Sequence, residues 1–369
     1  MSLTSNTLFA TVLVATTLMF VAAILLWPRF APRGWRRILG RIGLVIVVQV
    51  LVLSCVGLAA NRSFLIYGSW TELAGQEQAL TVGGRDAGGT SAVQVTDRLN
   101  PDVPGGRTKH LGGSIEKVMI EGERSKIATP AYVYLPPEYF QKGNEHRRFP
   151  ASVVLTGYPG TAENLLHGLR YPKTAWSLAK QQKMKPMILV MMRPTVAPPR
   201  NTQCIDIPGG PQTETFFGTD LPKALTGAYR IGTSSRSLGI IGDSTGGYCA
   251  LKVTLEHPES YSAGVGLSAD YEPESYGAGD LFHGNTAEQQ RADLLWSLDH
   301  LPQGNGAFLV TTSLKGEDNY GPTQKFIEKV KGPKRIYSIT LDSGGHSFNT
   351  WNREIPPSLE WLSTRLSAE

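Results

Sequence analysis

Two long apolar segments open the chain. Residues 8–27 contain no charged side chain, and residues 42–60 contain none either, Gln49 being the most polar member of the second segment. Each segment is long enough to cross about 30 Å of hydrocarbon as a helix. The pattern therefore predicts a transmembrane helical hairpin over residues 1–61, with spans at about 8–27 and 42–60.

Arginines between the two segments predict the orientation of this hairpin. The first 60 residues hold no acidic residue and no lysine, and their basic residues are Arg29, Arg33, Arg36, Arg37 and Arg41. Positively charged loops between spans stay in the cytoplasm. We therefore expect a multi-pass protein of the cell membrane whose later residues face the extracytoplasmic side. A cleaved signal peptide fits less well, because residues 1–7 carry no positive charge.

Periodicity changes twice after the hairpin. Residues 83–107 are rich in Gly, Asp and Pro without sustained periodicity, which predicts an extracytoplasmic linker over 62–111. From 112 to 369, short apolar runs alternate with helical stretches, which predicts one α/β domain with a mostly parallel, doubly wound sheet. The expected strands are 117–121, 131–135, 151–156, 187–193, 237–242, 263–268, 307–312 and 335–341. The expected helices are 161–182, 220–231, 246–257, 323–330 and 357–366.

Composition and charge exclude several classes of protein. A chain with 41% hydrophobic and 18% charged residues is too apolar to be disordered or a coiled coil. The five arginines account for the whole net charge of +5, so the charges of the remaining residues sum to zero. The rest of the chain therefore carries no electrostatic signature of nucleic-acid binding. Three cysteines are too few for a four-cysteine zinc site, and no HExxH or CxxC motif is present. We expect no metal and no cofactor.

A candidate nucleophile lies in the sequence Gly242-Asp243-Ser244-Thr245-Gly246. It matches G-x-S-x-G, the sharp turn that presents a serine hydroxyl above a sheet. The context fits, since a predicted strand ends at this turn and a predicted helix follows it. Ser244 is therefore the predicted nucleophile. Asp243 is interpreted as a residue that packs or hydrogen-bonds locally.

A serine nucleophile needs a base and an acid that orients the base. His346 follows the last predicted strand, where the chain order Ser, acid, His places the base of an α/β-hydrolase. The acid should follow the preceding strand, and the carboxylates there are the adjacent Glu317 and Asp318. We favour Asp318 because its shorter side chain precedes Tyr320 as in the usual acid turn, with Glu317 as the alternative.

Two backbone N–H groups should stabilise the oxyanion of the reaction. One is that of Thr245. The other should come from the loop after the strand at 151–156, where Tyr158 is the candidate because Pro159 has no N–H. In an oxidising exterior Cys204 and Cys249 could form a disulfide, and two buried free thiols are the equal alternative.

Residues 115–366 resemble the Putative esterase branch of the α/β-hydrolases, which includes esterase D and the antigen 85 mycolyltransferases. The stretches that carry the resemblance are 212–216, 220–222, the nucleophile turn, 257–261, 267–268 and 344–346. The resemblance implies an oxyanion N–H at Tyr158 and a triad acid at Glu317 or Asp318, since relatives use either type of carboxylate. Asp243 departs from the family, whose members more often carry a small, apolar or aromatic residue before the nucleophile.

These observations predict a membrane-anchored, extracytoplasmic serine esterase or acyltransferase that forms an acyl-Ser244 intermediate. Its substrate would be an acyl ester, such as a lipid or glycolipid of the cell envelope. Residues 271–306, inserted at the carboxyl edge of the sheet, would form a lid or an acceptor wall. The rival hypothesis is a non-catalytic α/β-hydrolase-like ectodomain that binds a ligand or assists envelope assembly.

Overall fold

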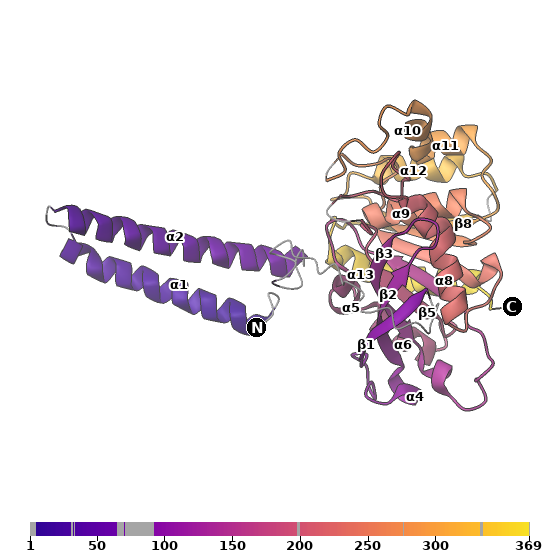
Figure 1. Cartoon of the computed structure of the whole chain (residues 1–369), viewed down its shortest axis with the longest axis horizontal. Helices are drawn as coiled ribbons and strands as arrows, with labels where there is room; N and C mark the ends of the chain where they lie inside the picture. Colours follow the sequence, from indigo (N-terminus) through magenta and orange to yellow (C-terminus); the bar gives the residue numbers. More distant parts are fainter. Residues whose placement is uncertain are drawn as a thin grey trace. The chain divides into compact units, whose positions relative to one another are not determined.

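The computed structural model describes residues 5–30, 32, 34–64, 70, 92–197, 200–275, 277–332 and 335–368. Two compact units account for the chain, Met1–Arg85 and Asp86–Glu369. Figure 1 shows the elements of both.

The first unit is a helical hairpin of α1 (Asn6–Leu26) and α2 (Trp35–Phe64), joined by the short helix Trp27–Phe30. The two helices contact each other where Thr16 Oγ1 lies 3.5 Å from Cys55 Sγ. Both are long and apolar enough to cross a membrane. The second helix begins seven residues before the predicted span at 42. The added residues include arginines, whose side chains can extend toward water from the end of a helix, so their charge does not prevent helix formation there.

The second unit is built on a nine-stranded sheet with the order β1-β2-β3-β5-β4-β6-β7-β8-β9. The strands β1, β2, β3 and β5 pair antiparallel with one another in turn, and all other pairs are parallel. The predicted mostly parallel sheet is therefore confirmed. The strands are β1 Val93–Leu99, β2 Ser114–Glu121, β3 Ala128–Leu135, β4 Ala151–Leu155, β5 Ile188–Met192, β6 Leu238–Asp243, β7 Ala263–Leu267, β8 Ala307–Ser313 and β9 Ile336–Leu341.

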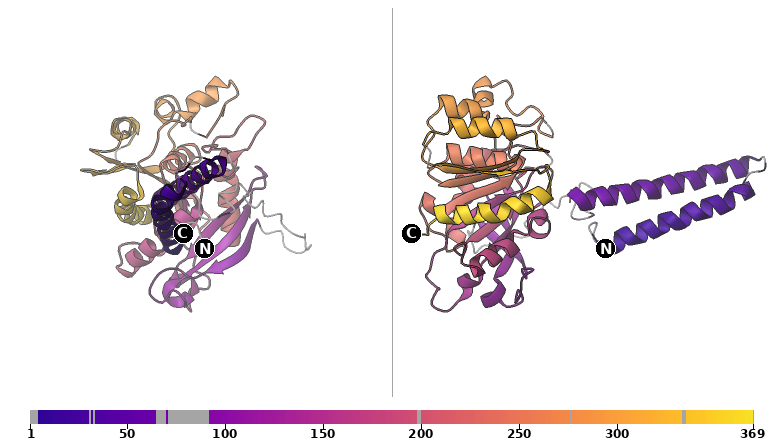
Figure 2. Two further views of the ribbon diagram at one scale, coloured as in Figure 1. Left: turned by 90° about the vertical axis from the view of Figure 1, so that its left-hand side faces the viewer. Right: turned by 180° about the vertical axis from the view of Figure 1, so that it is seen from behind.

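Helices cover both faces of this sheet, so its central strands are apolar at successive positions. Val153 of β4 packs in the cluster that includes α8 and α9, whereas Val154 packs on the opposite face with α5, α6 and α13. Figure 2 shows α13 in yellow, crossing its face of the sheet. The α-helices of this unit are α4 Lys109–Gly112, α5 Ala162–His167, α6 Tyr171–Lys180, α7 Thr213–Thr215, α8 Leu221–Ala228, α9 Thr245–Glu256, α10 Thr286–Ala292, α11 Leu294–His300, α12 Tyr320–Lys329 and α13 Phe348–Arg365.

The predicted linker over 62–111 is wrong in its second half. Strand β1 pairs antiparallel with β2, and α4 follows it, so the unit that holds the sheet includes residues that the sequence assigned to the linker. Only the first residue of β1 is buried. An edge strand of this kind takes its hydrogen bonds from its neighbour and needs no apolar alternation, which is why periodicity missed it. Residues 71–91 lie outside the described part of the chain.

Two predicted helices also differ from the structure. The predicted helix 161–182 is divided into α5 and α6, with Arg170 between them at a left-handed φ of 53°. The last helix, α13, begins at Phe348 and contains Pro356 and Pro357 inside it. We expected a start at the second of these prolines, because proline favours the first turn of a helix.

Candidate active site

The nucleophile turn joins β6 to α9. Ser244 stands between them with φ 54° and ψ −125°, a conformation that a non-glycine residue rarely adopts outside functional turns. The flanking glycines are required by contact: a Cβ on Gly242 would lie 2.3 Å from the carbonyl carbon of Gly246, and one on Gly246 would lie 2.4 Å from the carbonyl oxygen of Thr156. The sequence G-x-S-x-G therefore forms the turn that its pattern predicts.

The predicted base lies against the predicted nucleophile. His346 Nε2 is 2.8 Å from Ser244 Oγ, although the two residues are 102 positions apart in the chain. The imidazole is held edge-on by the Trp351 ring, with ring centroids 5.1 Å apart, and Trp351 Nε1 donates to Ser268 Oγ at 3.0 Å. Both supporting residues come from elements next to the site, α13 and the end of β7. The structure thus brings Ser244 and His346 into hydrogen-bond distance.

The electrostatic surroundings favour neutral His346. His346 is exposed as a whole residue, yet the protein atoms packed around the ring disfavour its charged form, and this desolvation lowers its pKa below the usual 6.5. The negative charges of Glu317 and Glu274 oppose that shift. A neutral imidazole is the form that can accept the serine proton.

The two adjacent carboxylates differ in environment. Both side-chain oxygens of Glu317 are buried and have no hydrogen-bond partner in the described part of the chain, and its charge acts on His346. Asp318 is exposed. No hydrogen bond joins His346 Nδ1 to either carboxylate among the described residues. The environment of Glu317, the alternative acid of the sequence prediction, thus fits the acid better than that of the favoured Asp318.

The candidate oxyanion donors lie on the two sides of Ser244. Thr245 is the first residue of α9, so its N–H has no partner within the helix. The Tyr158 N–H donates to Thr245 Oγ1 at 2.7 Å. The loop after β4 therefore contacts the nucleophile turn, with the second donor bound to a side chain of that turn.

A disulfide fixes the loop that borders the site. Cys204 and Cys249 are bonded, which ties residues 200–204 to α9. This loop holds the inserted segment 271–306: the Gln203 amide donates to the Glu274 carbonyl at 2.6 Å, and Glu274 N–H donates to Gln203 Oε1 at 2.7 Å. A Cβ on Gly277 would lie 2.6 Å from the Tyr158 hydroxyl, so the insert packs on the loop after β4. Sequence reasoning missed Gln203, because nothing in its local pattern marks it.

A buried ion cluster joins the insert to α9. Lys252, with only 2% of its side chain exposed, pairs with Glu214 at 2.6 Å and with Glu256. Arg291 of α10 reaches the same two carboxylates, at 2.5 and 2.9 Å. Glu214, Glu256 and His257 are close enough together to hold a metal ion. Their carboxylates are already neutralised by two cations, so this cluster fits a structural ion network better than a metal site.

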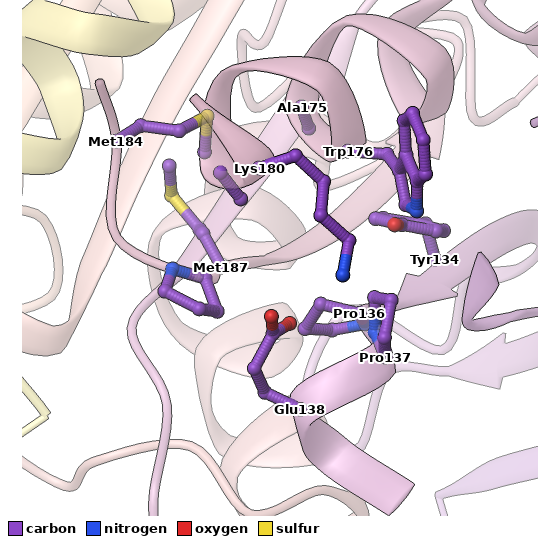
Figure 3. Close-up of a pocket in the computed structure, with 11 residues that line it drawn as sticks. Tyr134, Pro136, Pro137, Glu138, Ala175, Trp176, Lys180, Met184 and Met187 are labelled. Atoms are coloured by element: carbon purple, nitrogen blue, oxygen red, sulfur yellow. The ribbon is translucent and has the colours of Figure 1, made fainter. Parts of the chain in front are cut away.

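A separate narrow crevice lies away from this site. It is bordered by the end of β3, by α6 and by the segment before β5, with Glu138 and Lys180 directed into it (Figure 3). None of its lining residues belongs to the loops that carry Ser244, His346 or Tyr158. The crevice is therefore separate from the candidate active site.

Comparison with known proteins identifies the fold family. The sequence profile described as Putative esterase matches residues 123–362. The chain belongs to the Putative esterase family. The predicted resemblance and the predicted α/β-hydrolase fold are thereby confirmed.

Individual relatives of this esterase family member are distant. An uncharacterised protein of Corynebacterium glutamicum is 25% identical over 252 residues, which is 64% of this chain and 58% of the relative. This chain thus spans less than two thirds of that relative. A ferulic acid esterase structure superposes with a TM-score of 0.58 at 17% identity, covering 68% of this chain and 97% of that one. An S-formylglutathione hydrolase from Agrobacterium tumefaciens gives 0.57 at 18% identity, covering 74% and 100%.

The pKa of His346 predicts the acid limb of the pH profile. If neutral His346 is the base, kcat/KM for an ester should fall as pH decreases through the lowered pKa, and should be level above it. We expect the inflection below 6.5, the usual value for histidine. The measurement is kcat/KM at constant ionic strength across this range. An inflection above that value would show that nearby carboxylates outweigh desolvation.

Proposed function

We propose that this member of the esterase family is a membrane-anchored serine esterase or acyltransferase that acts on acyl esters from the extracytoplasmic side. The observation that carries the proposal is the 2.8 Å approach of His346 Nε2 to Ser244 Oγ on a strained nucleophile turn. Serine and histidine in this arrangement form the core of a hydrolytic triad.

The proposed reaction has two steps. His346 Nε2 accepts the proton of Ser244 Oγ while that oxygen attacks the ester carbonyl, and the same nitrogen then gives the proton to the leaving alcohol. Water, or a sugar hydroxyl, attacks the acyl-Ser244 ester with His346 again as the base. This second attack decides between hydrolysis and transfer.

Glu317 is the proposed triad acid. Its buried carboxylate acts electrostatically on His346 and would stabilise the imidazolium that forms in each step. Exposed Asp318 would lose most of such an effect to solvent screening.

The N–H groups of Thr245 and Tyr158 are the proposed oxyanion donors. The Tyr158 N–H now donates to Thr245 Oγ1, so binding of the tetrahedral intermediate would require this bond to be shared or exchanged for one to the oxyanion. A donor with a partner in the resting state avoids the cost of an unsatisfied buried N–H.

The proposed location rests on the hairpin and the disulfide. Helices α1 and α2 satisfy the length and polarity of membrane spans, and the Cys204–Cys249 bond suits an oxidising exterior. A lipid or glycolipid ester of the cell envelope would then be within reach of the site. Protease added to intact cells should cleave the catalytic unit, whereas a cytoplasmic unit would stay intact.

The test of the proposed activity uses the full chain in detergent. The enzyme is incubated with a medium-chain acyl ester, with and without trehalose as a sugar acceptor, and the products are weighed by mass spectrometry. Free acid alone would identify a hydrolase, and acylated sugar would identify a transferase. Absence of turnover and of acyl-Ser244 on all esters offered would contradict the proposal.

A further inference from the structure

Asp243, the residue before the nucleophile, is buried yet acidic. It ends strand β6 with only 1% of its surface exposed. Its Oδ2 accepts the Gly157 N–H at 2.8 Å, while Oδ1 has no hydrogen-bond partner among the described residues. Glu354 of α13 and Tyr171 of α6, which are both buried, lie near enough for the charge of Asp243 to raise the pKa of each. Burying a carboxyl in such surroundings costs free energy unless hydrogen bonds offset it, and the Gly157 N–H is the donor that comes from another element.

That contact reaches the loop that carries the oxyanion donor. Gly157 precedes Tyr158, and a Cβ on Gly157 would lie 2.9 Å from Ser244 Cβ and 3.1 Å from Asp243 Oδ2. The loop therefore passes too close to the nucleophile for a side chain at this position. Glycine is also the residue with the most backbone freedom, so something else must hold the loop in place.

The two neighbours of Ser244 hold two consecutive N–H groups of this loop. Asp243 Oδ2 binds that of Gly157, and Thr245 Oγ1 binds that of Tyr158. When Thr245 releases or shares the Tyr158 N–H during the reaction, the bond between Asp243 and Gly157 still joins the loop to the nucleophile turn.

We propose that Asp243 is a positioning residue, whose carboxylate fixes the Gly157 N–H so that the Tyr158 N–H stays aimed at the oxyanion position. The role rests on the proposed function of Ser244. The Asp243 carboxylate would help to stabilise only the charge that develops in the transition state. Its removal should therefore lower kcat and leave KM little changed.

Burial of Asp243 raises its pKa to about 7, with the Gly157 N–H opposing the shift. The contact does not depend on one protonation state, because the carbonyl oxygen of a neutral carboxyl or a carboxamide can also accept an N–H. An asparagine at this position should therefore still accept the Gly157 N–H, whereas an alanine cannot.

The test compares Asp243→Ala with Asp243→Asn in the full chain, using a p-nitrophenyl ester. Active enzyme is counted by labelling Ser244 to completion with a fluorophosphonate, so that kcat refers to competent sites. Removal of one oxyanion donor costs about 100- to 1,000-fold in kcat. Because Asp243 acts through the loop, we expect Asp243→Ala to lose about 10- to 100-fold in kcat with KM within about 3-fold, and Asp243→Asn to stay within about 3-fold.

Asp220→Ala is the matched control. Asp220 is likewise buried, and its carboxylate also holds a loop through backbone N–H groups, those of Arg124 and Ser125. The Asp220→Ala substitution should lower the melting temperature without changing kcat per labelled serine. A kcat of Asp243→Ala within about 2-fold of wild type would overturn the role, and so would an equal loss in Asp243→Asn. A wild-type chain that neither turns over nor is labelled would overturn the proposed function itself.

Discussion

Replacing Ser244 by alanine is expected to lower kcat on acyl esters by on the order of 10³-fold or more. The hydroxyl that His346 Nε2 contacts at 2.8 Å is the atom that would form the acyl-enzyme, and alanine has no substitute for it. The residual rate would come from the oxyanion donors and from substrate binding. The measurement is the steady-state rate per folded enzyme, with mass spectrometry of the intact chain to detect the acyl adduct.

Ser260→Ala serves as the control for this substitution. Its hydroxyl donates to the Gly218 carbonyl at 2.7 Å, in the segment that precedes β7 at the opposite end of that strand from the site. Its kcat should match that of the wild type. A Ser244→Ala enzyme with more than about a tenth of the wild-type rate, or with an acyl adduct, would show that another group is the nucleophile.

Replacing Glu317 by glutamine is expected to lower kcat by roughly 10³- to 10⁴-fold, as loss of the triad carboxylate does in serine proteases. The buried Glu317 carboxylate stabilises a positive charge on His346, and a neutral amide cannot. Glutamine keeps the size of the side chain, so the loss would reflect charge more than packing. The measurement is kcat together with the pH profile, because the pKa of His346 should also fall when the negative charge is removed.

Asp318→Asn is the natural control, since it removes the neighbouring charge from an exposed position. Its kcat should stay within about 3-fold of the wild type, because surface charges are screened by solvent. If Asp318→Asn were the inactive variant and Glu317→Gln the active one, the loop would have to rearrange on substrate binding. The original sequence preference for Asp318 would then be restored.

The choice between Glu317 and Asp318 could not be made from the sequence. Chain order placed the acid after β8, and this left two adjacent residues of the same charge. A preference based on side-chain length could not include burial, because the environment of each carboxylate depends on β9, α13 and the histidine loop. Only the folded chain shows that Glu317 is the buried member of the pair.

The edge strand β1 and the insert 271–306 were the other features that the sequence predicted poorly. Strand β1 is almost wholly exposed and is held by its pairing with β2, so its residues carry no periodic signal. The insert 271–306 was predicted to form a lid or an acceptor wall at the site, but no helix was predicted where α10 and α11 lie. Its attachment uses the contact of Gln203 with Glu274, 71 positions apart, and that of Arg291 with Glu214, 77 positions apart.

Features that depend on neighbouring residues could be predicted from the sequence alone. Apolar runs gave the two long helices and the eight strands from β2 to β9, and the G-x-S-x-G pattern gave the nucleophile turn, because hydrophobic period and local steric limits act over a few residues. Features that depend on the distance between remote segments required the folded chain. It brought His346 to Ser244, joined Cys204 to Cys249 and turned Asp243 toward Gly157. Hydrogen bonds and bonded sulfurs require atoms within a few ångströms, and a linear sequence does not specify such separations.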